Sequence, residues 1–77
     1  MPTVLRVRGY RIGFFSADWH EPPHVHVSKR GSTAKFWVNP VQLVVNYGFR
    51  PDELRDIVHI LERHEEQILQ AWNQYFG

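Results

Sequence analysis

The chain has 77 residues and a mass of 9.2 kDa, with 9 Lys and Arg, 8 Asp and Glu, and a formal net charge of +1. A chain this short forms one small domain that buries only about 60% of its unfolded surface. It contains no cysteine, which excludes disulfides and thiolate metal sites. No apolar run reaches the length of a signal peptide or a membrane span, so we expect a complete, cytoplasmic protein.

The charges are distributed unevenly along the chain. Residues 1–50 carry seven Lys and Arg against two Asp and Glu, whereas residues 51–77 carry two against six. This asymmetry predicts one face suited to a polyanion and another face turned away from it. The alternative is that both sets form ordinary solvated surface.

The beginning of the chain has the pattern of a β-hairpin. Residues 3–7 and 10–16 each alternate apolar with polar side chains, which predicts two antiparallel strands. Arg8-Gly9 predicts the tight turn between them. Residues 17–23 predict a loop.

A second hairpin follows this loop. Residues 24–29 and 32–38 predict its two strands, and Arg30-Gly31 predicts its turn. Residues 41–46 form a further apolar run that predicts a short fifth strand at the edge. The strands together predict one antiparallel sheet of four to five strands.

From Pro51 onward the pattern changes to that of a helix. Apolar residues recur at helical spacing, which predicts one long C-terminal helix over residues 51–76 packed on one face of the sheet. The predicted fold class is therefore α+β. A helix of this length spans about 39 Å, but a six-residue strand covers only about 20 Å.

The predicted helix therefore overhangs its sheet. Apolar side chains on the overhang predict an interface for a partner protein or for a homodimer through the C-terminal helix. The residues of this predicted interface are Ile68, Leu69, Trp72 and Phe76. The alternative is a helix that bends near His64 and folds its second half back onto the sheet.

The stretch from His20 to Val27, with the sequence HEPPHVHV, gathers several chemically capable side chains. Its two prolines favour extended geometry, so the following residues continue as a strand. Side chains two apart on a strand share a face, which brings His24 and His26 together, and His20 precedes the prolines closely enough to fold back toward them. Imidazole exchanges protons near neutral pH and binds zinc, copper, nickel or iron. A merely structural role is the alternative.

Counting outward from the turn at residues 30–31 places Lys35 opposite His26 and Trp37 opposite His24. A cation and an indole beside two imidazoles favour a phosphate or a base over a metal ion, because the cation repels the metal.

Cleavage of RNA without a metal requires a base, an acid and a cation. The residues predicted to be catalytic on this hypothesis are His20, His24, His26 and Lys35. Those predicted to bind nucleic acid or phosphate are Arg11, Lys29 and Trp37. A metal site would instead use His20, His24 and His26; we expect no cofactor.

Several segments resemble one protein family. The start MPTVLR, the segment GYRIGFFSADWHEPPHVHV, the strand KFWVNPV and the helix GFRPDEL…LERHEEQILQAW resemble the small bacterial domain-of-unknown-function family 4160. The resemblance covers essentially the whole chain. Members of that family tend to have Ser where Arg50 stands, which leaves the exact start of the helix open.

The resemblance implies a bacterial cytoplasmic protein with a small cognate partner encoded alongside. Members of the family are often encoded beside another small family of unknown function, family 2442, in an arrangement like a toxin–antitoxin pair. The resemblance implies no catalytic residues. The hypotheses are therefore an RNA-directed member of such a pair, a non-enzymatic protein-interaction module, and a histidine metal-binding domain.

Overall fold

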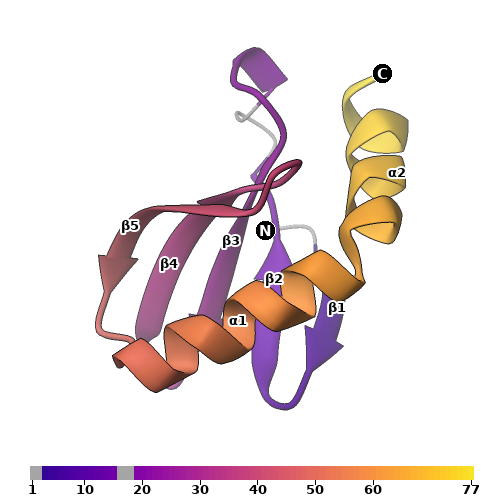
Figure 1. Cartoon of the computed structure of the whole chain (residues 1–77). Coiled ribbons are helices and arrows are strands. Elements are labelled where there is room, and N and C mark those ends of the chain that lie inside the picture. Colours follow the sequence, from indigo (N-terminus) through magenta and orange to yellow (C-terminus); the bar gives the residue numbers. More distant parts are fainter. Residues whose placement is uncertain (1–2, 16–18) are drawn as a thin grey trace.

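The computed structural model describes residues 3–15 and 19–77 (Figure 1). The elements in chain order are β1 (Thr3–Val7), β2 (Tyr10–Gly13), β3 (His24–Lys29), β4 (Ser32–Trp37), β5 (Gln42–Tyr47), α1 (Pro51–Arg63) and α2 (Glu65–Phe76). The strands form one antiparallel sheet in the order β1-β2-β3-β4-β5. The predicted α+β class and its antiparallel sheet are confirmed.

The two predicted hairpin turns have the backbone that such turns require. Arg8 and Gly9 have φ angles of 49° and 85°, and Arg30 and Gly31 have 52° and 84°. Two successive residues with positive φ match the twist of the flanking strands. The second turn places His26 opposite Lys35 and His24 opposite Trp37, as counting from the turn predicted.

The predicted strands 10–16, 32–38 and 41–46 have different bounds in the structure. β2 ends at Gly13, β4 ends at Trp37, and β5 is shifted by one residue. β2 ends early because Phe14 leaves the sheet to pack edge-on against Trp72, with ring centroids 5.4 Å apart. Residues 16–18 lie outside the described residues.

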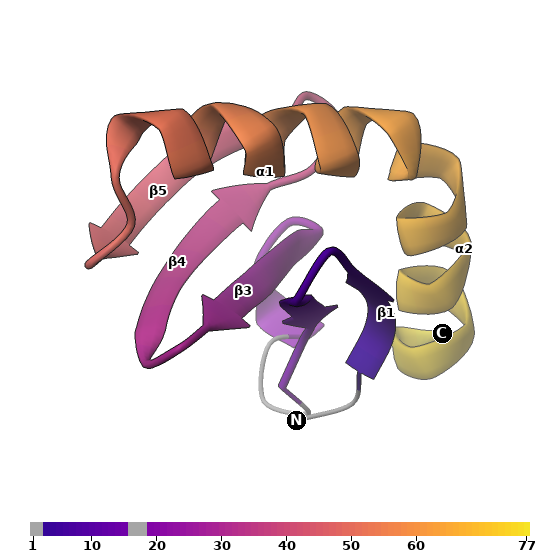
Figure 2. The ribbon, with the colours of Figure 1, turned by 90° about the horizontal axis from the view of Figure 1, so that it is seen from below.

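The hydrophobic core lies between one face of the sheet and the helices. Figures 1 and 2 show α1 running across this face. The core residues include Tyr10, Ile12, Val25, Val27, Ala34, Phe36, Ile57, Ile60, Leu61 and Ile68. Within the described part of the chain, no helix is both long and apolar enough to cross a membrane.

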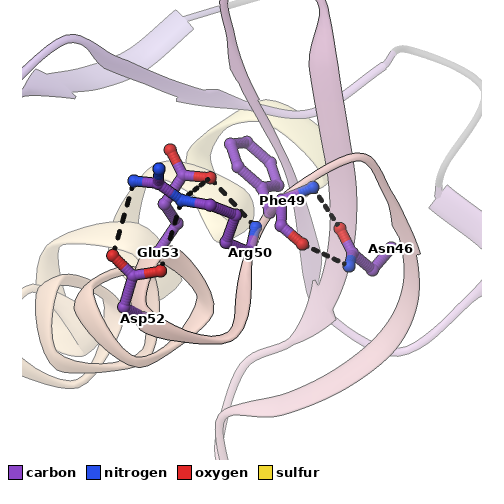
Figure 3. A network of polar contacts seen from close by, with 5 residues as sticks. All are labelled: Asn46, Phe49, Arg50, Asp52 and Glu53. Carbon is purple, nitrogen blue, oxygen red and sulfur yellow. Dashed lines mark hydrogen bonds and ion pairs between the residues drawn. The ribbon is translucent and has the colours of Figure 1, made fainter.

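Helix α1 begins at Pro51, immediately after Arg50, although Arg50 has no side-chain acceptor for the first turn. The Glu53 carboxylate instead accepts the backbone N–H of Arg50 at 2.9 Å. Before it, the Asn46 side chain donates to the carbonyl of Phe49 and accepts its N–H, both at 3.0 Å (Figure 3). These bonds fix the connection from β5 to the helix.

The prediction of one long helix over residues 51–76 is wrong. The helix breaks at His64, whose φ and ψ are −110° and 16°, and α2 turns down past the β1 edge (Figure 2). The ring Nδ1–H of His64 donates to the carbonyl of Ile60 at 2.9 Å. The bend buries Ile68 and Trp72 within the chain. Burying two such side chains contributes about 3–6 kcal/mol, against about 1 kcal/mol for a hydrogen bond.

The predicted apolar overhang is therefore absent. Two of its four residues are buried against the molecule itself, and the other two, Leu69 and Phe76, are half-buried. The alternative, a bent helix folding back, describes the structure correctly. The partner and homodimer predictions lose the exposed overhang on which they rested.

Candidate nucleic-acid interface

We call the sheet face opposite α1 the open face. The pairing of residues between neighbouring strands arranges the side chains of this face in rows. None of the described helices lies over this face (Figures 1 and 2). One row across the five strands consists of Arg6, Arg11, Ser28, Thr33 and Tyr47. The next row consists of Gly13, His26, Lys35 and Val45. The face thus carries cations near β1 and an exposed phenol at β5.

His24 stands at the end of this face and is enclosed by rings. Its side chain is 0% exposed, and its ring centroid lies 5.7 Å from Trp37 and 5.2 Å from Trp72. Its Nδ1–H donates to the carbonyl of Pro22 at 2.9 Å. β2 pairs with β3 only as far as His26, and Trp72 packs beside His24 beyond that point. These contacts enclose His24, and its side chain has no exposed surface.

His26 is half-buried beside Phe15. The two ring centroids are 4.6 Å apart in an edge-on arrangement, and those of His24 and His26 are 5.3 Å apart. The predicted pairing of the two imidazoles on one face is therefore present. The Nε2 atoms of both rings are buried, so neither is presented to a ligand on the surface.

Lys35 forms an ion pair that the sequence did not predict. Its Nζ lies 2.6 Å from Glu21 Oε1 and 5.0 Å from the centroid of the Trp37 ring. The same carboxylate oxygen lies 3.5 Å from His24 Nε2. The sequence contains one indication of this ion pair: Glu21 lies in the loop that leads directly into β3, and β3 pairs with the strand β4 that carries Lys35. Glu21 offsets the positive charge of Lys35.

The remaining predicted site residues lie apart from one another in the structure. His20 is exposed and packs edge-on against Trp19 at 5.0 Å; in the described part of the chain, no contact joins it to the strand histidines. Lys29 Nζ lies 4.4 Å from the centroid of Tyr10, a core ring. Lys29 is therefore on the side of the sheet opposite the histidines. Arg11 lies on the open face, where its Nε donates to Thr3 Oγ1 at 2.8 Å.

A shallow hollow of about 320 Å³ opens on the same face. It is lined by Phe15, His26, Val27, Ser28 and Thr33. The Phe15 ring is 45% exposed, and the two hydroxyls supply donors and acceptors beside it. An aromatic wall beside hydroxyl groups suits a planar polar group such as a nucleobase.

The described residues contain no cluster of three His, Asp or Glu side chains arranged to hold a metal ion. The predicted ligand set of His20, His24 and His26 does not converge, because one ring is exposed and another is enclosed by indoles. The geometry therefore gives the metal-site hypothesis no support.

A comparison with protein families matches residues 9–73 to a family described as "Domain of unknown function (DUF4160)". Comparisons with curated proteins and with solved structures found no match.

Proposed function

The chain belongs to the DUF4160 family, and we propose that the open face of its sheet binds single-stranded RNA as one member of a toxin–antitoxin-like protein pair. The observation that supports this is the row from Arg6 and Arg11 to Tyr47, a residue that is 67% exposed. Cations beside aromatic faces suit the phosphates and unstacked bases of a single strand.

The aromatic side chains near this row favour a single strand over a duplex. From β2 to β5 the row crosses three strand spacings, about 14 Å. Phe15 packs against His26 in the next row, and Trp37 opposes His24 in the row after that. Ring faces accept bases only when the bases are unstacked, so a duplex hides the surface that these side chains recognise.

We propose binding rather than cleavage. A general acid and a general base must lie within hydrogen-bond reach of the reacting oxygens. His24 is enclosed, and its Nε2 and that of His26 are buried. The Lys35 ammonium is already paired with Glu21. The catalytic set of His20, His24, His26 and Lys35 is therefore left out of this proposal.

Fluorescence anisotropy with a labelled single-stranded RNA and a matched duplex tests the proposal. Tyr47→Ala should weaken single-strand binding by about 5- to 150-fold, because stacking on one ring contributes about 1–3 kcal/mol. Arg11→Gln should lower the salt slope by about 0.7, since one phosphate contact is lost.

Matched controls are available on the helices. Tyr75→Ala removes a half-exposed phenol from α2, and Arg55→Gln removes a cation from α1. Both should bind RNA as the wild type does. Equal affinity for duplex and single strand, or equal losses in the control variants, would contradict the proposal.

Induced expression in a bacterial host tests the toxin–antitoxin-like part. The wild type should arrest growth while total RNA stays intact, and Tyr47→Ala should relieve the arrest. Loss of RNA that depends on His26 would instead support cleavage, and normal growth with the wild type would contradict a free toxin.

A further inference from the structure

β5 forms one edge of the sheet. The strand order ends at β5, which pairs only with β4 among the described strands. Figure 1 shows no described element along its outer side. An edge strand presents a row of backbone N–H and C=O groups that pairs readily with another extended strand.

This edge lacks most of the usual protection against such pairing. Its sequence, QLVVNY, contains neither a charged residue nor a proline. Leu43 and Val44 are 42% and 40% exposed. The register shift opposite Lys35 and Phe36 gives β5 one extra residue, but Val45 to Tyr47 pair regularly beyond it. Charge, proline and bulges are the devices that blunt free edges, and only the last is present here.

An apolar hollow lies directly beside the edge, between β5 and α1. It measures about 270 Å³ and is lined by Phe36, Leu43, Leu54, Arg55, Val58 and His59. Side chains of a strand added to β5 would point alternately toward this hollow and toward the open face. The edge therefore offers apolar contact in addition to backbone hydrogen bonds.

We propose that β5 pairs antiparallel with β5 of a second copy of the chain, forming a two-fold dimer with one continuous sheet. Because the strand is uncharged, self-pairing brings no like charges together. The other edge, β1, carries Arg6 and lies beside α2 (Figure 2). Pairing β5 with β5 covers the exposed β5 edge of each copy, so the assembly closes as a dimer. Pairing β5 with β1 would leave a free edge at each end, and the chains would polymerise.

The backbone groups of β5 form this dimer, whereas side chains on the open face bind RNA, so dimerisation can fail while RNA binding holds. It replaces the helix-mediated dimer predicted from the sequence, whose Ile68 and Trp72 are buried within the chain. Tyr47 stands near the proposed seam, so the open faces of two copies would adjoin.

Sedimentation velocity over a concentration series from about 1 µM to about 1 mM tests the dimer. The wild type should shift from 9.2 kDa to twice that mass. Val44→Lys, which places a cation on the edge, should stay monomeric throughout. Gln70→Lys, which adds the same charge on the exposed side of α2, should dimerise as the wild type does.

Cross-linking gives a second readout, which remains informative if Val44→Lys fails to fold. The chain has no cysteine, so Val44→Cys introduces a single thiol at the seam. Oxidation should link Val44→Cys into covalent dimers faster than it links Gln70→Cys. A wild type that is monomeric at every concentration, equal cross-linking of the two variants, or a dimer that persists in Val44→Lys would overturn the proposal.

Discussion

His24 lies among the rings of Trp37, His26 and Trp72, and this position decides its role. The alternating pattern of the strand predicts that a histidine on its polar face is available for chemistry. Whether that histidine is buried depends on which residues pack beside it. In this chain Trp72, 48 positions further along, supplies one wall. His24 therefore stabilises the end of the sheet, and the accessible part of the open face begins at Phe15 and Lys35.

Glu21 offsets the charge of Lys35, so its removal should strengthen RNA binding. Glu21→Gln leaves the Lys35 ammonium without this carboxylate, and we expect binding to tighten by about threefold or more at low ionic strength. Anisotropy titrations at several salt concentrations measure the effect. Glu62→Gln, which neutralises an exposed carboxylate on α1, is the control. Equal tightening in both variants would show a general charge effect and contradict the local one.

Tyr10 makes the stability of the fold sensitive to alkali. Burial raises the pKa of the Tyr10 phenol above its usual 10.0, and the carboxylates of Glu53 and Asp56 raise it further. The neutral phenol is thus favoured in the folded chain. Its contribution to stability is fully present below pH 10 and is lost as the pH rises through the folded-state pKa.

Urea unfolding at about pH 9 and about pH 11 measures this loss. Tyr10→Phe should show a smaller fall in the free energy of unfolding between the two pH values than the wild type. Tyr47→Phe, which removes an exposed phenol, should behave as the wild type does. An unchanged fall in Tyr10→Phe would assign the pH dependence to other groups.

Among the elements, α1 is preceded by Arg50, an N-terminal cap residue whose side chain accepts no hydrogen bond from the first turn. Arg50 pairs with Asp52 at 3.3 Å on the surface, and an exposed ion pair contributes little stability. A Ser side chain at position 50 would accept a backbone N–H of the first turn. The Glu53 carboxylate already accepts the backbone N–H of residue 50. Half of a capping box is therefore present.

Arg50→Ser should raise the free energy of unfolding by about 0.5–1 kcal/mol by completing that box. Thermal or urea unfolding measures the gain. Arg55→Ser, inside the same helix, removes an equal charge without a capping position and should give no gain. A loss of stability in Arg50→Ser would show that the arginine ion pair matters more than the cap.

On the scale of the whole molecule, the division of charge follows the division of structure. The strands all come from the basic first 50 residues, and both helices come from the acidic remainder. α1 covers one face, α2 lies beside the β1 edge, and no described helix covers the other face (Figure 2). α2 completes the core by turning Trp72 toward Phe14 and His24.

Trp72→Ala should therefore lower the free energy of unfolding by about 3–5 kcal/mol, a large share of what so small a domain possesses. Urea unfolding measures the loss, and Gln70→Ala on the exposed side of α2 should change it by less than about 0.5 kcal/mol. A stable Trp72→Ala protein with altered self-association would instead return α2 to the role of an interface.

Features that depend on residues close together in the chain could be predicted from the amino-acid sequence. The alternation of side chains and the turn residues Arg30-Gly31 set the pairing of His24 with Trp37 and of His26 with Lys35. Pro51 and the apolar spacing after it set the start of α1. These features could be predicted because period and turn geometry are local properties of the chain.

Long-range packing determines four features that the sequence pattern did not predict: the break at His64, the early end of β2, the burial of His24 and the pairing of Lys35 with Glu21. A continuous helix and a bent one share the same apolar spacing. The bend is favoured because Ile68 and Trp72 then bury surface against Phe14 and the sheet. Contacts between residues so far apart in the chain leave no periodic signal, and these contacts determine which predicted site residues remain accessible.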